Sequence, residues 1–174
     1  MKIHFLGAPD ASFARSSEHE FIPYGPEIPP FAVDALVVFT EVETEDDHVK
    51  TLRRSGRPVL NLAFNEPSSA PAPAPQKDVE LNEWLERLGE MPRTNYQPID
   101  CNFYDNFEDA IVQRREVELE YRTVDEATVM KTTRLKDLKT YRTEEYVQLE
   151  NGAWLRLDQI VSVDGEAAGG SCRF

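Results

Sequence analysis

The sequence predicts an α+β protein, with a small α/β unit at its N-terminal end and a small antiparallel β-barrel or sandwich, led by a helix, at its C-terminal end. Three observations predict this class. Continuous apolar runs alternate with a helical pattern before residue 65, strictly alternating strands follow residue 115, and a Pro/Ala-rich segment lies between them. The chain of 174 residues is long enough for one compact domain or two small ones.

Residues 1–65 have the pattern of a small α/β domain. Val49 and Leu52 have helical spacing, and the run Ala35–Phe39 is apolar throughout, as in a strand buried on both faces. A strand, a helix and a strand within about 30 residues predict a parallel βαβ unit. The four prolines within 11–32 predict an irregular segment there. The expected elements are strands over 2–6, 35–39 and 58–62 and a helix over 46–55.

Residues 66–77 are predicted to be a semi-rigid linker between domains. Prolines that alternate with small residues cannot continue a helix or a central strand, and they favour extended polyproline geometry. A long surface loop is the alternative interpretation. An amphipathic helix is predicted next, over 78–91 of the segment 78–94, with Asp78 as its N-cap. Its apolar stripe does not indicate which domain it packs on: Val79, Leu81, Trp84, Leu85 and Leu88.

Residues 95–165 are predicted to form the barrel domain, and 166–174 a flexible tail. A helix is expected over 105–115, because Asp105 as N-cap and Glu108 three residues later make a capping box. Asn151-Gly152 predicts a two-residue hairpin turn. The expected strands are 116–122, 127–135, 145–150 and 154–163, the last as one strand or two.

The charge of the chain restricts its partners. It has 19 basic and 32 acidic residues, a formal net charge of −13, which makes it a poor general nucleic-acid binder because phosphate contacts need Lys and Arg. No apolar run approaches the roughly 18 residues of a membrane span, and the apolar stretch at the N-terminus is too short for a secretory signal. We therefore expect a cytoplasmic protein that contacts other proteins and no membrane.

The sequence offers no convincing catalytic, cofactor-binding or metal-binding set, so an enzyme is not predicted. Glu18-His19-Glu20 has residue types that bind metals, but a polar loop explains it better. Gly7-Ala8-Pro9-Asp10 follows the first strand, where α/β proteins bind phosphates, yet it lacks the P-loop and dinucleotide patterns. Cys101, flanked by acids, is expected to be a small buried core residue, and Cys172 to be incidental.

Four acidic residues fall within ten positions that contain no Lys or Arg: Asp100, Asp105, Glu108 and Asp109. On a helix that begins at Asp105, the last three share one side. Capping explains Asp105 and Glu108, since an acid near a helix N-terminus contributes about 0.3–1 kcal/mol. Capping does not require Asp100 as well. An interface for a basic partner is the other interpretation, and both stay open.

Two sequence blocks resemble a known family. Tyr96-Gln97-Pro98-Ile99-Asp100-Cys101, followed by Tyr104-Asp105-Asn106-Phe107-Glu108, resembles the opening of the Rof family of Rho-binding antiterminators. Residues 145–150 and 155–160 are similar to its closing strands. The resemblance covers about 95–165, less than half of the chain. It implies an Sm-like small β-barrel with an N-terminal helix, which binds the hexameric transcription terminator Rho and blocks its RNA-binding surface.

The resemblance also implies which residues face Rho: Asp100, Asp105, Asn106, Glu108 and Asp109. A surface that grips RNA is basic, so an acidic protein can occupy it. The alternative is an Sm-like RNA-binding module or another protein-interaction module. Ten basic and sixteen acidic residues in 95–174 disfavour RNA binding, although one basic cluster keeps it open: Lys131, Arg134, Lys136, Lys139 and Arg142. Residues 1–94 have no counterpart in the family, and the sequence indicates no role for them.

Overall fold

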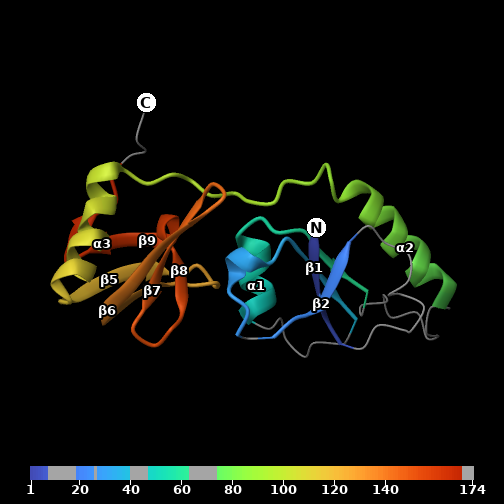
Figure 1. The fold of residues 1–174 in the computed structure, drawn as a ribbon, viewed down its shortest axis with the longest axis horizontal. Helices are drawn as coiled ribbons and strands as arrows, with labels where there is room; N and C mark the ends of the chain where they lie inside the picture. The colour runs from blue at the N-terminus through green and yellow to red at the C-terminus, as the bar shows by residue number, and fades with distance from the viewer. Residues whose placement is uncertain (8–18, 26, 40–46, 63–73, 170–174) are drawn as a thin grey trace. The chain divides into compact units, whose positions relative to one another are not determined.

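The protein consists of two compact units, residues 1–95 and 96–174 (Figure 1). Each unit has its own helices and its own sheet, so the predicted α+β class is confirmed. The computed structural model describes residues 1–7, 19–25, 27–39, 47–62 and 74–169. No helix in this described part of the chain is long and apolar enough to cross a membrane.

The first unit is built on a parallel four-stranded sheet in the order β2-β1-β3-β4. All four residues of β3 are buried, as the apolar run predicts, and β3, α1 and β4 form the predicted parallel βαβ unit. The elements are β1 (Lys2–Leu6), β2 (Glu20–Pro23), η2 (Pro30–Ala32), β3 (Ala35–Val38), α1 (Asp47–Arg54), β4 (Val59–Asn61) and α2 (Ala74–Arg87).

Strand β2 lies in the proline-rich segment 11–32 that was expected to be irregular, and that prediction is wrong for Glu20–Pro23. β2 pairs with β1 at the edge of the sheet, with Phe5 opposite Pro23. A proline has no N–H for the sheet's hydrogen bonds, but an edge strand tolerates it. Residues 11–18 lie outside the described residues.

Helix α2 begins four residues before the predicted N-cap, Asp78. Residues 74–77, assigned above to the linker, are therefore helical, with Pro75 in the first turn. A proline is tolerated there because its missing N–H has no intrahelical partner in any case. The other residues of the predicted linker, 66–73, lie outside the described residues.

The apolar side of α2 belongs to the core of the first unit. Leu81 and Leu88 are buried in one cluster with Ile3 and Val37. Val79, by contrast, is 56% exposed, so its place in the predicted apolar stripe is wrong. Helix α2 therefore belongs to the first unit, and the boundary between the units falls later than predicted, after Asn95.

Asn95 is held against the turn that follows α1. Its backbone N–H donates to the carbonyl of Ser55 (3.3 Å), and its side-chain Nδ2 donates to the carbonyl of Arg54 (2.7 Å). Gly56 has a φ of +78°, and a Cβ at this position would lie 2.7 Å from the Asn95 nitrogen. These contacts explain why the first unit extends to Asn95.

The second unit is a six-stranded antiparallel sheet in the order β10-β9-β5-β6-β7-β8, preceded by α3. Val117 and Leu119 of β5 are buried, as the alternation predicts, and a hairpin that contains Asn151-Gly152 joins β7 to β8. The predicted two-residue turn is wrong, because Leu149 pairs with Ala153 and residues 150–152 lie between them. The elements are α3 (Cys101–Gln113), β5 (Glu116–Arg122), β6 (Thr128–Tyr141), β7 (Glu144–Leu149), β8 (Trp154–Arg156), η3 (Leu157–Gln159), β9 (Ile160–Val163) and β10 (Glu166–Ala167).

Strand β6 continues six residues beyond its predicted end at Leu135. Its first half, through Arg134, pairs with β5, and its second half, from Leu135, pairs with β7, and the register of the β7 pairing shifts between Leu135 and Asp137. A β-bulge of this kind bends a strand, so one strand serves both neighbours. The predicted flexible tail is also wrong at Glu166–Ala167, which form β10.

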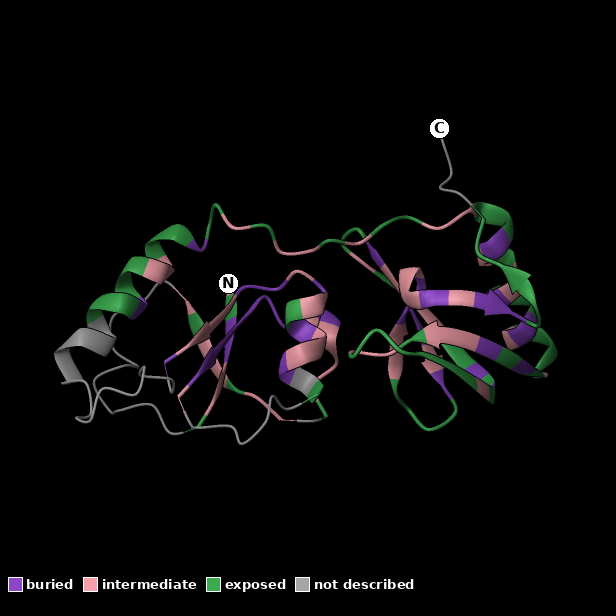
Figure 2. Cartoon of the chain, turned by 180° about the vertical axis from the view of Figure 1, so that it is seen from behind, coloured by how far each residue is buried: buried purple, intermediate pink, exposed green. Residues whose placement is uncertain are grey.

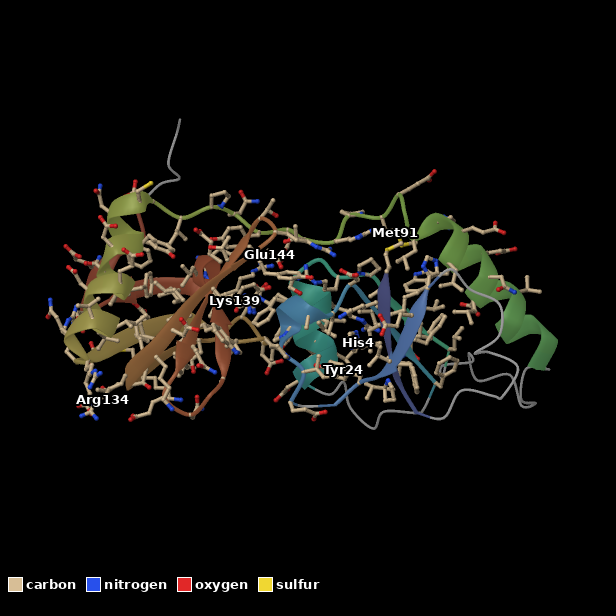
Figure 3. The ribbon with its side chains drawn as sticks, in the orientation of Figure 1. His4, Tyr24, Met91, Arg134, Lys139 and Glu144 are labelled. Carbon is tan, nitrogen blue, oxygen red and sulfur yellow. The ribbon has the colours of Figure 1, made fainter. Side chains whose placement is uncertain are left out.

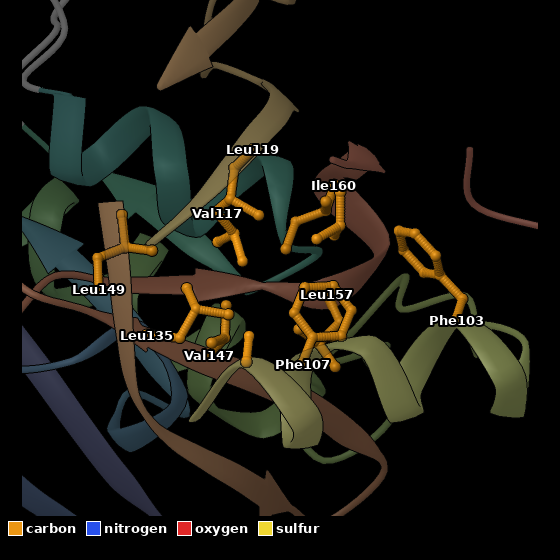
Figure 4. Packing of buried hydrophobic residues seen from close by; sticks show 11 residues of the cluster. Phe103, Phe107, Val117, Leu119, Leu135, Val147, Leu149, Leu157 and Ile160 are labelled. Atoms are coloured by element: carbon orange, nitrogen blue, oxygen red, sulfur yellow. The ribbon is translucent and has the colours of Figure 1, made fainter. Parts of the chain in front are cut away.

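The core of the second unit lies between α3 and the strands (Figure 4). Phe103 and Phe107 of α3 meet edge to face, with ring centroids 5.2 Å apart, and pack with Leu119 and Leu157. β9 returns to pair with β5, but no pairing within the described residues joins β8 to β10. The predicted barrel is therefore present as an open sheet in the described part of the chain.

Candidate protein-binding surface

Helix α3 begins at Cys101, four residues before the predicted start. Asp100 is its N-cap, with an extended backbone and a side chain that accepts a hydrogen bond from the Asn102 N–H (2.9 Å). The predicted N-cap at Asp105 and its capping box with Glu108 are wrong. The start at Cys101 is favoured over the start at Asp105 because it places Phe103 and Phe107 on the buried face of a 13-residue helix.

Three carboxylates lie together on the exposed side of α3: Asp105, Glu108 and Asp109. We call them the acidic stripe. All three residues are exposed, and no described Lys or Arg forms an ion pair with them. Figure 2 shows both exposed and buried stretches on α3. The predicted patch is thus present and anionic.

Helix capping does not explain the acidic stripe. The helix dipole acts mainly on the first turn, and α3 has no acidic residue there. Asp105 and Glu108, and Asp105 and Asp109, are like charges at i,i+3 and i,i+4, which oppose one another. Of the two interpretations left open by the sequence, capping therefore accounts for Asp100 alone, and the stripe itself has no stabilising role.

The other two residues that the resemblance assigns to Rho contacts are engaged within the chain. Asp100 is the N-cap described above. Asn106 is half-buried and donates a hydrogen bond from Nδ2 to Oε2 of Glu166 (2.9 Å). The structure therefore brings Asp105, Glu108 and Asp109 together on one surface and leaves Asp100 and Asn106 in structural contacts.

Val112 extends the stripe by one helical turn, and the sequence analysis did not identify it. Its side chain is 80% exposed, although it is a valine in a helix with a buried face. It lies three residues after Asp109 and seven after Asp105, which places it on the same side. Which side of the helix Val112 lies on can be worked out from the sequence only when the first residue of the helix is known.

A buried charge network lies elsewhere in the second unit, around Arg156. Arg156 is 6% exposed and Glu144 is 2% exposed. The Arg156 guanidinium donates two hydrogen bonds to Asp158 (2.6 and 2.9 Å), and its Nη1 lies 3.5 Å from Glu144 Oε1. Tyr146 Oη donates to the other Glu144 oxygen (2.9 Å). Each of these charges therefore has partners.

The same network joins the two sequence blocks that carry the family resemblance. The Gln97 N–H donates to Asp158 (3.2 Å), and Tyr96 Oη donates to Glu145 (2.5 Å). Burial and this hydrogen bond raise the pKa of Tyr96 well above its usual value. The Tyr96-Gln97 start of the first block is thus anchored on the second block, which gives these motif residues a role in the fold.

Cys101 is exposed and forms a disulfide bond, so its prediction as a buried thiol is wrong. The helix start at Cys101 explains the exposure, because Phe103 and Phe107 take the buried face instead. The only other cysteine of the sequence is Cys172, which lies outside the described residues.

The remaining candidate sites in the first unit are mostly outside the described residues. Glu18 and residues 8–10 belong to segments that the structure does not describe. Within the described ranges, no group of three or more His, Cys, Asp and Glu side chains is arranged to hold a metal ion. The structure therefore adds nothing to these candidates.

Comparisons with known proteins find partial similarity to solved structures. No protein-family model matches the chain, and no curated protein sequence matches it. Among solved structures, the chain is similar to the proteasome accessory factor B/C (PafBC) of Arthrobacter aurescens, at 17% identity and a TM-score of 0.33. The similarity covers 44% of this chain and 14% of that one, which is too little to carry an argument about fold or function.

Proposed function

We propose that the second unit binds the transcription terminator Rho through the acidic stripe and inhibits Rho-dependent termination. One observation carries the proposal: Asp105, Glu108 and Asp109 form an exposed anionic surface that no described basic side chain neutralises. The stripe lies within the sequence block that resembles the Rof family, and in that family the partner is Rho.

We also propose that the second unit is of the Sm-like kind. A helix followed by five antiparallel strands, with the fifth strand, β9, back beside the first, β5, supports this proposal. The strongly bent β6, which pairs with β5 over one half and β7 over the other, supports it as well.

The chemistry of the interaction is electrostatic. A surface that grips the RNA backbone must be rich in Lys and Arg, and a row of carboxylates on a rigid helix presents negative charge to it as RNA does. Because exposed charges are screened by salt, the affinity for Rho should fall as ionic strength rises. Val112 adds an apolar contact at the end of the stripe.

Charge reversal tests the proposal. The triple variant Asp105→Lys, Glu108→Lys, Asp109→Lys should weaken binding to purified Rho by on the order of 100-fold, as measured by surface plasmon resonance. It should also restore termination on a Rho-dependent template. The folded state should persist, because these side chains are exposed.

A matched control separates a specific surface from general charge attraction. The variant Glu80→Lys, Glu83→Lys, Glu86→Lys makes the same change in net charge on the exposed side of α2, in the other unit. It should leave the affinity for Rho within about twofold. Equal losses in both variants would show that overall charge, and no particular surface, attracts Rho.

RNA binding is the second candidate, favoured by the exposed basic residues of β6. Arg134, Lys136 and Lys139 are exposed on this strand, and Figure 3 shows Arg134 and Lys139 along it. If RNA is the partner, gel-shift binding of a single-stranded RNA should be lost when these three residues are changed to Gln. Binding that survives those changes excludes this candidate.

A further inference from the structure

A groove of about 500 Å³ lies at the C-terminal end of α3, lined by that helix end and by β6. The neutral part of its lining is apolar: Ile111 and Val112 from α3 and Leu135 from β6. Leu135 is 4% exposed, whereas Val112 is 80% exposed. The groove therefore has apolar surface in reach of a ligand.

Three cationic side chains line the same groove. Arg114 is the C-cap of α3 and has a left-handed backbone (φ +53°). Arg134 forms an ion pair with Glu116 (3.4 Å), and Lys136 Nζ donates to the backbone carbonyl of Glu150 (2.5 Å). The Glu150 carboxylate is the acidic group of the lining.

This gathering of positive charge is unexpected on a chain with a net charge of −13. Within the described residues, no carboxylate forms an ion pair with Arg114, and the Lys136 ammonium is bonded to a neutral carbonyl. Like charges that converge on one groove repel one another unless an anion joins them. The lining has three cationic side chains and the Glu150 carboxylate, a formal charge of +2 before the ion pair of Arg134 with Glu116, which lies outside the lining, is counted.

We propose that this groove binds a small phosphate monoester with an apolar or aromatic body. The phosphate contacts Arg114, Arg134 and Lys136, and the body packs on Val112 and the half-buried Ile111. A phosphate monoester carries about −1.5 to −2 charges at pH 7, which matches the lining. Guanidinium groups bind phosphate through two parallel hydrogen bonds, and the volume lies within the usual range of ligand sites.

A long nucleic acid fits this groove less well than a small ligand does. The acidic stripe lies on the same helix, with Asp109 only three residues before Val112, and its carboxylates repel a polyanion that extends along α3. A small phosphate ester ends within the groove and does not reach them. The groove shares Val112 with the proposed contact with Rho, but its cationic residues lie outside that contact.

Nuclear magnetic resonance titration of the full chain tests the site. The probes are inorganic phosphate, phenyl phosphate, phenol and a 12-nucleotide single-stranded RNA. Phenyl phosphate should shift the amide signals of the groove residues and bind at least about tenfold more tightly than inorganic phosphate, and phenol should not bind. Tighter binding of the RNA than of phenyl phosphate would overturn the proposal in favour of a nucleic-acid surface.

Variants separate the two parts of the site. Arg114→Asn with Lys136→Gln should weaken both phosphate probes by tenfold or more; Asn suits the left-handed position. Val112→Ser should weaken phenyl phosphate several-fold and leave inorganic phosphate unchanged. Lys131→Gln, on the same strand outside the lining, is the matched control and should change neither.

Two further results would overturn the proposal. One is an equal loss of affinity in Lys131→Gln, which would indicate non-specific charge attraction. The other is the absence of groove shifts in the unaltered protein at millimolar phenyl phosphate, a result that does not depend on whether any variant folds.

Discussion

The second unit uses its charged residues in two opposite ways. Around Arg156, the charges are almost excluded from solvent, and every one has a partner: Glu144 accepts from Tyr146, and Asp158 receives two hydrogen bonds from the guanidinium. In the acidic stripe, the carboxylates are exposed and have no described basic partner. Both regions lie within the segment that resembles the Rof family.

The difference shows how to separate structural motif residues from binding residues. A buried charge costs several kcal/mol unless it is paired and hydrogen-bonded, so a paired buried acid is best explained by the fold. An exposed acid among like charges adds nothing to the fold and stays available to a partner. On this basis, Tyr96, Gln97 and Asp158 are structural, and Asp105, Glu108 and Asp109 are the binding candidates.

The largest effect is expected at Arg156. Arg156→Met should lower the free energy of unfolding of the second unit by about 3–5 kcal/mol, because it leaves Glu144 buried without a cationic partner. The chain has one tryptophan in each unit, Trp84 and Trp154, so urea unfolding followed by fluorescence in a Trp84→Phe background reports the second unit alone. Arg122→Met, at an exposed position, is the control, and equal effects in the two variants would contradict the comparison.

Within the described part of the chain, His4 is a buried polar residue without the hydrogen-bonded ion pairs that surround Arg156, so its variants extend the comparison to the first unit. It is 3% exposed, its Nδ1 has no hydrogen-bond partner among the residues that the structure describes, and burial lowers its pKa from the usual 6.5. The unfolded chain then takes up the proton first, so the first unit should lose stability as pH falls below about 6.5 and keep it above that value. Urea unfolding followed by Trp84 fluorescence in a Trp154→Phe background measures this.

His4→Phe is the matched variant for this pH dependence. It keeps an aromatic ring beside Tyr24, which the imidazole meets edge to face at 6.1 Å, and it removes the titrating group. The loss of stability between pH 7.5 and 5.5 should be smaller in the variant. An identical pH dependence would show that other groups cause it.

Two acidic positions of α3 offer a smaller and sharper test. Asp100→Ala should destabilise the second unit by about 1 kcal/mol, because it removes the N-cap. Asp109→Ala, on the exposed side of the same helix, should change stability by less than about 0.5 kcal/mol. Thermal unfolding followed by Trp154 fluorescence compares the two variants. Equal losses of stability would indicate that the acidic stripe stabilises the fold.

The smallest expected effect is a gain in stability. The variant Asp105→Asn, Glu108→Gln, Asp109→Asn should raise the free energy of unfolding by a few tenths of a kcal/mol, because it removes repulsion between like charges. The gain should shrink at about 1 M salt, where such repulsion is screened. A clear loss of stability would mean that the stripe supports the fold.

Much of the fold could be predicted because its signals are local. The alternation of Glu116–Arg122 and the apolar run of β3 each depend on neighbouring residues, and the structure agrees with both. The Asn-Gly pair lies in the hairpin between β7 and β8, although the connection is one residue longer than predicted. The candidate site was predicted in part. Its carboxylates were identified from their spacing, but their positions on the helix were not, because the predicted helix began four residues late.

The sequence by itself determined the two patterns of secondary structure, the acidic character and the block that contains the stripe, since these depend on residue types and short spacings. Only the tertiary structure decided which acid caps α3, which acids stay exposed and which arginines gather in the groove. The physical reason is that Asp100 and Asp105 are equally good caps locally. The choice between them follows from burying Phe103 and Phe107 against strands that lie far along the chain.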